Sequence, residues 1–173
     1  MKRIIFSIFS LAAVLTACNN AETKTASNSA SSIKLPYEAS YTGDFNNNVS
    51  DSDLLLVLNT YKYWETGDMK GLRSTMGDTI SVDASDGFKF TGPADTMMKT
   101  WQTVRDSMSS VVITMDAWVK SHSVKDNSNY ITTWYKEIDT YKTGRVDSAN
   151  YSDVNGLKNG KIIWFSSYKQ KLK

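Results

Sequence analysis

Residues 50–68, SDSDLLLVLNTYKYWETGD, predict a long amphipathic helix and decide how the rest of this 173-residue chain is interpreted. Ser50 or Ser52 can cap its start, with acidic residues in the first turn, and Gly67 can end it. Apolar side chains recur every three or four positions and form one stripe, made of Leu54, Val57, Leu58, Tyr61 and Trp64. The helix therefore needs a partner surface that covers this stripe.

Two shorter helices are expected to follow. Asp68 can cap a second helix that runs to Met76, and Gly92-Pro93 places a proline at the favoured first position of a third. The third helix carries its own apolar stripe, made of Ala94, Met97, Trp101, Val104 and Met108.

Strands account for the remaining pattern. Two short ones, 79–83 and 88–91, flank the turn Asp86-Gly87. Four longer segments are rich in β-branched and aromatic residues, namely 111–120, 130–140, 145–154 and 161–168. Asn159-Gly160 should join the last two. Helices followed by long antiparallel strands predict an α+β fold, with the helices on one face of a curved sheet.

The N-terminus has the order of parts of a bacterial lipoprotein signal. Lys2 and Arg3 precede an uncharged apolar run, residues 4–15, which is shorter than the roughly 20 residues of a membrane-spanning helix. Thr16 and Ala17 then precede Cys18, the only cysteine. We expect cleavage after residue 17 and lipidation of Cys18. The alternative is an ordinary secretory signal, cut elsewhere, that leaves a free thiol.

The rest of the chain divides into three parts. Residues 18–32 contain no aromatic residue and, after Cys18, no aliphatic one larger than alanine, which predicts a flexible tether. Residues 33–50 are more aromatic and predict an extended arm, and 51–173 form the folded domain. These features predict an exported, lipid-anchored protein of the cell envelope. Asn19, in place of an aspartate associated with inner-membrane retention, favours the outer membrane.

Composition argues against several classes of partner and cofactor. Removing Lys2 and Arg3 from the 20 basic residues leaves 18, which equals the number of acidic residues, so the mature chain has no net charge to attract nucleic acid. His122 is the only histidine, so no metal site of the His/Cys type is expected. No phosphate-binding glycine motif occurs, and no cofactor is predicted.

The order of turns and caps resembles that of the SnoaL-like, nuclear-transport-factor-2-like superfamily. The matching features are an aromatic first helix ending in Gly67-Asp68, then Leu72, Asp78 before a strand, Gly92 before the third helix, and Asn-Gly-Lys-Ile at 159–162. The resemblance implies a cone-shaped α+β barrel, in which a bent sheet wraps the long helix around a pocket. Members include cyclases, ketosteroid isomerases, dehydratases, and non-catalytic binding or dimerising domains.

The resemblance also suggests where catalytic groups would lie. The catalytic aspartate of isomerase-type members would correspond to Asp83. Their tyrosine donor would fall at Thr60, with Tyr61 turned away by one step, and their acidic donor near Ser152, with Asp153 facing the other side. With one of three roles filled, this isomerase chemistry is not favoured.

Two further sets of residues, one acidic and one aromatic, are candidates for either the protein surface or a ligand site. Glu137 and Asp139 lie two apart on one strand, a spacing that suits paired carboxylates. Lys136 and Lys142 beside them favour a solvent-exposed face. The aromatic residues instead predict a ligand site, with a lining that comprises Tyr61, Trp64, Trp101, Trp118 and Trp134.

The leading interpretation is therefore a non-catalytic binding module for a small, partly apolar molecule. One alternative is an acid/base enzyme, an isomerase, cyclase or lyase that uses Asp83. Another is a domain that forms a homodimer through its sheet, for which residues 162–165 supply apolar side chains.

Overall fold

The computed structural model describes residues 36, 37, 39 and 44–172. The chain divides into two units, 1–37 and 38–173. The helices and strands of the described residues all belong to the second unit. The signal peptide, Cys18 and the tether lie outside the described residues, as do residues 33–35, 38 and 40–43 of the arm. No helix in the described part of the chain is long and apolar enough to cross a membrane.

The first helix, α1 (Asp51–Thr66), forms where the sequence predicts it. Ser50 caps its start, since the Ser50 hydroxyl oxygen accepts a hydrogen bond from the Asp53 amide at 3.0 Å. Gly67 ends it with a φ of 74°, a backbone conformation that glycine adopts without steric cost. Val57 and Tyr61 are its buried residues and face the core.

The two other helices are α2 (Met69–Ser74) and α3 (Ala94–Asp106). Asp68 caps α2, where its carboxylate accepts from the Gly71 amide at 2.8 Å. Pro93 directly precedes α3. Met108 belongs to the next strand and not to the helical stripe, because α3 ends two residues earlier.

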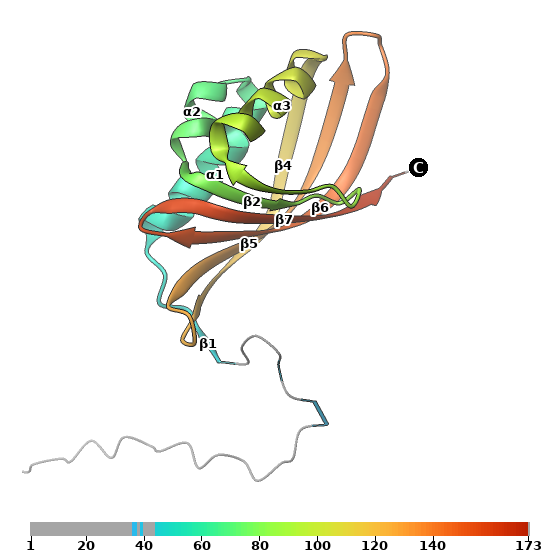
Figure 1. Cartoon of the computed structure of the whole chain (residues 1–173). Coiled ribbons are helices and arrows are strands. Elements are labelled where there is room, and N and C mark those ends of the chain that lie inside the picture. The colour runs from blue at the N-terminus through green and yellow to red at the C-terminus, as the bar shows by residue number, and fades with distance from the viewer. Residues whose placement is uncertain (1–35, 38, 40–43, 173) are drawn as a thin grey trace, which may run out of the picture. The chain divides into compact units, whose positions relative to one another are not determined.

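Seven strands form one curved, unclosed sheet in the order β1-β4-β5-β6-β7-β2-β3, with all three helices against one face (Figure 1). Their bounds are β1 (Phe45–Asn46), β2 (Met76–Asp83), β3 (Lys89–Pro93), β4 (Met108–Ser123), β5 (Ser128–Tyr141), β6 (Val146–Lys158) and β7 (Lys161–Lys171). The predicted α+β fold is confirmed. The sheet is not purely antiparallel, however, because β2 and β7 pair in parallel. They are far apart in sequence, so no hairpin fixes their relative direction.

The turn between β6 and β7 is the predicted one. Asn159 and Gly160 have φ values of 53° and 66°, which match the tight hairpin turn that Asn-Gly favours. β1 lies within the predicted arm, and it pairs with the end of β4.

The core lies between the helices and the inner face of the sheet. Its largest fully buried apolar side chains are Val57, Ile80, Ile131, Leu157 and Ile162. In β5 every second residue from Ile131 to Asp139 is buried, whereas the residues between them are half-buried or exposed. The inner row of β5 therefore faces the helices, together with the paired inner residues of β6 and β7.

Candidate functional site

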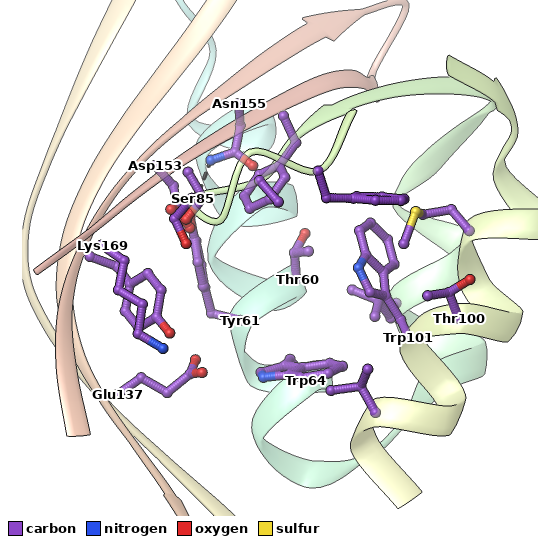
Figure 2. Close-up of a pocket in the computed structure, with 18 of the residues that line it drawn as sticks. Thr60, Tyr61, Trp64, Ser85, Thr100, Trp101, Glu137, Asp153, Asn155 and Lys169 are labelled. Carbon is purple, nitrogen blue, oxygen red and sulfur yellow. Dashed lines mark hydrogen bonds between the residues drawn. The ribbon is translucent and has the colours of Figure 1, made fainter. Parts of the chain in front are cut away.

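A cavity of about 520 Å³ lies between α1, α3 and the inner face of β5, β6 and β7 (Figure 2). Its lining has an apolar part and a polar part. The apolar part comes mostly from the helices and the β2–β3 hairpin, and the polar part comes from the long strands. The two parts are built by different elements, so each is considered in turn.

Two tryptophans dominate the apolar part. Trp64 projects from α1 and Trp101 from α3, and in Figure 2 both indole groups face the hollow. The apolar surface around them is completed by Leu72, Met76, Ile80, Met97 and Phe165. Each tryptophan is only partly buried, so a ligand could still cover part of its ring.

Hydrogen bonds around Asp153 organise the polar part. Tyr135 donates from its hydroxyl group to Asp153 Oδ2 at 2.8 Å, and Tyr61 donates to the same oxygen at 3.2 Å. The Tyr61 hydroxyl oxygen accepts from Asn155 Nδ2 at 3.1 Å and lies 2.6 Å from Thr133 Oγ1. With the Tyr61 proton directed to Asp153, Thr133 is the donor in that last pair. The network joins α1 to β5 and β6.

The Asp153 carboxyl group is buried, with an exposed fraction of 0%. Burial raises its pKa to about 6, while the hydroxyl groups of Ser167, Tyr135 and Tyr61 oppose the rise. Only Oδ2 is held by the two tyrosines. Oδ1 is buried, and no donor of the described residues meets it in good hydrogen-bond geometry. A buried polar atom without a partner is costly, so Oδ1 is a candidate contact for a bound molecule.

Glu137 and Asp139 also line the cavity, contrary to the predicted surface location. Their exposed fractions are 9% and 6%, because both lie on the inner row of β5. Burial raises the pKa of Glu137 to about 8, and the Asp139 charge and hydrogen bond add to the effect. Burial likewise raises the pKa of Asp139, opposed by Glu137 and Lys169. The two carboxyl groups therefore hold a proton between them near neutral pH.

One lysine lies beside these carboxyl groups. Lys169 on β7 lines the cavity, and its Nζ lies 5.2 Å from the centre of the Tyr151 ring. That ring stacks on Tyr135, with centroids 5.2 Å apart and an interplanar angle of 11°. The Lys169 charge lowers the pKa of Glu137 but does not outweigh burial.

The structure brings three of the five predicted ligand-binding residues to this cavity. Tyr61, Trp64 and Trp101 line it. Trp118 and Trp134 do not, and their exposed fractions are 49% and 41%. Trp134 lies on the outer row of β5, since its neighbours Thr133 and Tyr135 are the buried ones.

Asp83, predicted as a catalytic acid, is not part of the cavity lining. It lies at the end of β2, where it accepts from Trp164 Nε1 at 3.2 Å and pairs with Lys89 at 3.1 Å. These partners, Lys89 first, lower the pKa of the Asp83 carboxyl, whereas a general base at neutral pH needs a raised one. The structure instead places Asp153, Glu137 and Asp139 at the cavity.

The sequence carries a signal for Asp153, although the resemblance placed the acidic donor near Ser152. Tyr61 and Asp153 are each one residue beyond the family positions assigned to Thr60 and Ser152. Shifting both elements by one residue brings the tyrosine and the acid to the same cavity, and the structure shows them in contact. Tyr61 was expected to line the site, whereas the expectation that Asp153 faces the other side was wrong.

Among the described residues, no group of three or more His, Cys, Asp or Glu side chains is arranged to hold a metal ion. The carboxyl groups at the polar end instead interact with tyrosines, with the charge of Lys169 and with one another.

Comparison with known proteins bears on the N-terminus and on the fold. Residues 1–19 match the family model "Prokaryotic membrane lipoprotein lipid attachment site". No curated protein sequence matches the chain.

Many of the solved structures similar to the domain are NTF2-like proteins. An NTF2-like protein of unknown function from Burkholderia pseudomallei has a TM-score of 0.58 at 15% identity, covering 70% of this chain and 92% of that one. An LEH-like epoxide hydrolase from M. tuberculosis has a TM-score of 0.59 at 8% identity, covering 70% and 84%. AusH from Aspergillus nidulans has a TM-score of 0.57 at 12% identity, covering 70% and 86%. The domain thus has the SnoaL-like, NTF2-like fold, and identities this low show the fold alone.

Proposed function

We propose that this NTF2-like domain binds a small, partly apolar molecule in its cavity and is held at the cell envelope by lipid on Cys18. One observation carries the proposal. A single cavity joins two partly buried tryptophans to a buried carboxyl group, Asp153, that has an unpartnered oxygen.

The cavity has the size and composition of ordinary ligand sites. Its volume of about 520 Å³ lies within the range of about 300–1,000 Å³ typical of small-molecule pockets. Such pockets combine apolar walls with a few well-placed polar groups. Here Trp64 and Trp101 would contact the apolar body of the ligand, and the strand side chains would fix its polar end.

The N-terminal lipid attachment site supports membrane anchoring. Cleavage after residue 17 and acylation of Cys18 would leave the tether 18–32 and the arm 33–50 ahead of the domain 51–173. A coil as long as the tether has an r.m.s. reach of about 20 Å, enough to separate the cavity from the bilayer surface. Asn19 favours the outer membrane.

Tryptophan fluorescence tests binding directly. The full-length protein in detergent micelles is titrated with a library of small non-fluorescent aromatic and alicyclic compounds. A true ligand should shift or quench the emission of the wild-type protein. That response should fall by at least about half when Trp64 and Trp101 are both replaced by phenylalanine.

The exposed tryptophans supply the matched control. Replacing Trp118 and Trp134 by phenylalanine also removes two indoles, but neither lines the cavity. The response to the ligand should persist in this variant. If no compound changes the emission of the folded wild-type protein, or if the control variant loses the response equally, the proposal fails.

A second candidate function is acid/base catalysis at the same cavity. Asp153 has a pKa raised to about 6 and two tyrosine donors, a combination that suits proton transfer near neutral pH. The similarity to an epoxide hydrolase makes epoxides a reasonable first substrate set. Turnover that is lost in Asp153→Asn but retained in Asp83→Asn would favour this function over simple binding. No turnover would count against it.

Homodimerisation through the sheet stays a prediction. The outer surface supports it, since Trp134, Tyr168 and Val112 are exposed there. Sedimentation velocity of the full-length protein, compared with Trp134→Ser, would detect a dimer and its loss.

A further inference from the structure

We infer that the molecule bound in this cavity carries an organic cation, such as an ammonium group, which is received by the carboxyl groups of Glu137, Asp139 and Asp153. The inference rests on the proposed binding function and adds the chemical class of the ligand's polar end. It follows from the charges, the unpartnered oxygens and the aromatic rings at that end.

The charge balance at the polar end is negative. Three buried or nearly buried carboxyl groups face the hollow from β5 and β6, and Lys169 is the one cation among the described residues that line this end. The other groups that act on this cluster are Asp147, Arg105 and the hydroxyls of Ser167, Tyr61, Tyr135, Tyr141 and Tyr151.

Arg105 does not neutralise the cluster from within. Its guanidinium group is committed to α1, where it donates to the Trp64 carbonyl at 2.9 Å and to the Glu65 carbonyl at 3.1 Å. It is also absent from the cavity lining. A carboxylate or phosphate ligand would therefore meet more like charge than opposite charge at this end of the cavity.

The hydrogen-bonding capacity of the polar end also favours a cationic ligand. Asp153 Oδ1 and Asp139 Oδ1 are buried acceptors without a partner in good geometry among the described residues. The neighbouring tyrosine hydroxyls are already used, since Tyr61 and Tyr135 both donate to Asp153 Oδ2. These two oxygens can accept further hydrogen bonds, and an ammonium group brings three donors and no acceptor.

The aromatic rings suit a cation as well. Tyr151 already has the Lys169 ammonium over its ring at 5.2 Å, and Tyr141 has the Arg145 guanidinium at 3.9 Å from its ring centre. Both tyrosines line the cavity. A cation close to an aromatic face gains about 0.5–2 kcal/mol, more when it is desolvated. Figure 2 shows Glu137 and Lys169 on one side of the hollow and Trp64 and Trp101 on the other.

A competing possibility is a neutral ligand that accepts a hydrogen bond from a protonated acid. At neutral pH Glu137 holds a proton, because its pKa is raised to about 8, and so it could donate one. The two classes of ligand respond oppositely to pH. A cation binds better when Glu137 is ionised, so its affinity rises with pH. A hydrogen-bond acceptor binds better when Glu137 is protonated, so its affinity falls.

Three probes with the same apolar body separate these classes. 4-Phenylbutylammonium, 4-phenylbutanol and 5-phenylpentanoate share the phenylbutyl group and differ only in the polar end, which is cationic, neutral or anionic. Calorimetric titration into the full-length protein in detergent should rank them in that order at pH 7.5, with at least a tenfold preference for the ammonium over the alcohol. Release of up to one proton per ligand would weaken ammonium binding by up to about tenfold per pH unit from pH 8 to pH 6.

Two variants locate the effect. Glu137→Gln should remove most of the pH dependence and reduce the preference for the ammonium over the alcohol. Asp139→Asn serves as a second variant if the first fails to fold. Asp116→Asn removes an exposed carboxylate outside the cavity lining, with the same change in net charge, and should leave all three affinities unchanged.

The outcomes separate this inference from the function on which it rests. Alcohol or carboxylate binding as tight as that of the ammonium, or ammonium binding that strengthens on acidification, would overturn the cation inference and leave the binding function standing. Failure of all three probes to bind would also overturn it. The binding function itself would fall if the fluorescence library gave no ligand or if the Trp118 and Trp134 control variant lost the response equally.

Discussion

The two faces of strand β5 show how this protein departs from the usual pattern of apolar inside and polar outside. On the inner row lie Tyr135, Glu137 and Asp139, all buried. On the outer row lie Trp134, Lys136 and Ile138, half-buried or exposed. The polar acids are inside and the largest apolar side chain is outside.

The difference follows from the cavity. Ordinary strands bury apolar residues because the inner face meets a packed core. The inner row of β5 instead borders a hollow, where Glu137 and Asp139 keep a shared proton and Asp153 is held by tyrosines. Buried acids are tolerated in such a place because neighbours hydrogen-bond them or because they stay protonated.

The largest expected effect compares neighbours on the two rows. Tyr135→Ala should lower the free energy of unfolding by about 3–4 kcal/mol, because it removes a buried ring and the donor to Asp153 Oδ2. Trp134→Ala should cost about 1 kcal/mol or less, since that side chain is largely exposed. Chemical denaturation of both variants measures the difference. Equal losses in the free energy of unfolding would contradict the larger contribution to stability expected of the inner row.

The next effect is the pH dependence that Glu137 gives to stability. Between its ordinary pKa of 4.5 and the raised value of about 8, the folded protein keeps a proton that the unfolded chain has lost. The free energy of unfolding should therefore fall as pH rises through this range and level off above it. Glu137→Gln should flatten that fall and be more stable than wild type at pH 8.5 by about 2 kcal/mol.

The control for that comparison is a pH series from 4 to 9 on Asp116→Asn, an exposed residue on the neighbouring strand β4. It should follow the wild-type curve. A wild-type protein whose stability rises from pH 5 to pH 8 would contradict the protonated state assigned to Glu137.

A smaller effect concerns the contact between α1 and β6. Tyr61→Phe removes one donor to Asp153, which should cost about 1 kcal/mol of stability. It should also raise the pKa of Asp153 above its value of about 6, because the Tyr61 hydroxyl opposes the effect of burial. Carboxyl ¹³C NMR titration measures the shift. Tyr63→Phe, on the same helix but outside the cavity lining, should leave that pKa unchanged.

The smallest expected effect is at Asp83. Its carboxylate pairs with the exposed ammonium of Lys89 and lies outside the cavity lining. Asp83→Asn should leave ligand affinity within about twofold and stability almost unchanged. A large loss of ligand affinity, measured in the same fluorescence titration, would indicate that Asp83 takes part in binding.

Several elements were predictable because their signals are local. The cap at Ser50, the stop at Gly67, the proline ahead of α3 and the Asn159-Gly160 turn each depend on one or two residues and their allowed backbone angles. The order of these local signals also identified the fold family. Tyr61, Trp64 and Trp101 were predictable because aromatic residues on the helices of this fold face its interior.

The location of Glu137, Asp139 and Asp153 at the cavity was not predictable in the same way. Alternation along β5 indicates two faces but does not say which one is inside, and Lys136 beside Glu137 suggested solvent. The parallel pairing of β2 with β7 and the meeting of Tyr61 with Asp153 both join segments more than 80 residues apart.

The amino-acid sequence alone thus determined where the helices begin and end, where the hairpin turns and that the N-terminus resembles a lipoprotein signal, since each depends on neighbouring residues. Only the tertiary structure decided that Glu137, Asp139 and Asp153 share one cavity while Trp118 and Trp134 lie outside it. The physical reason is that the inner face of a strand is chosen by what the whole sheet wraps around, and here it wraps around a hollow.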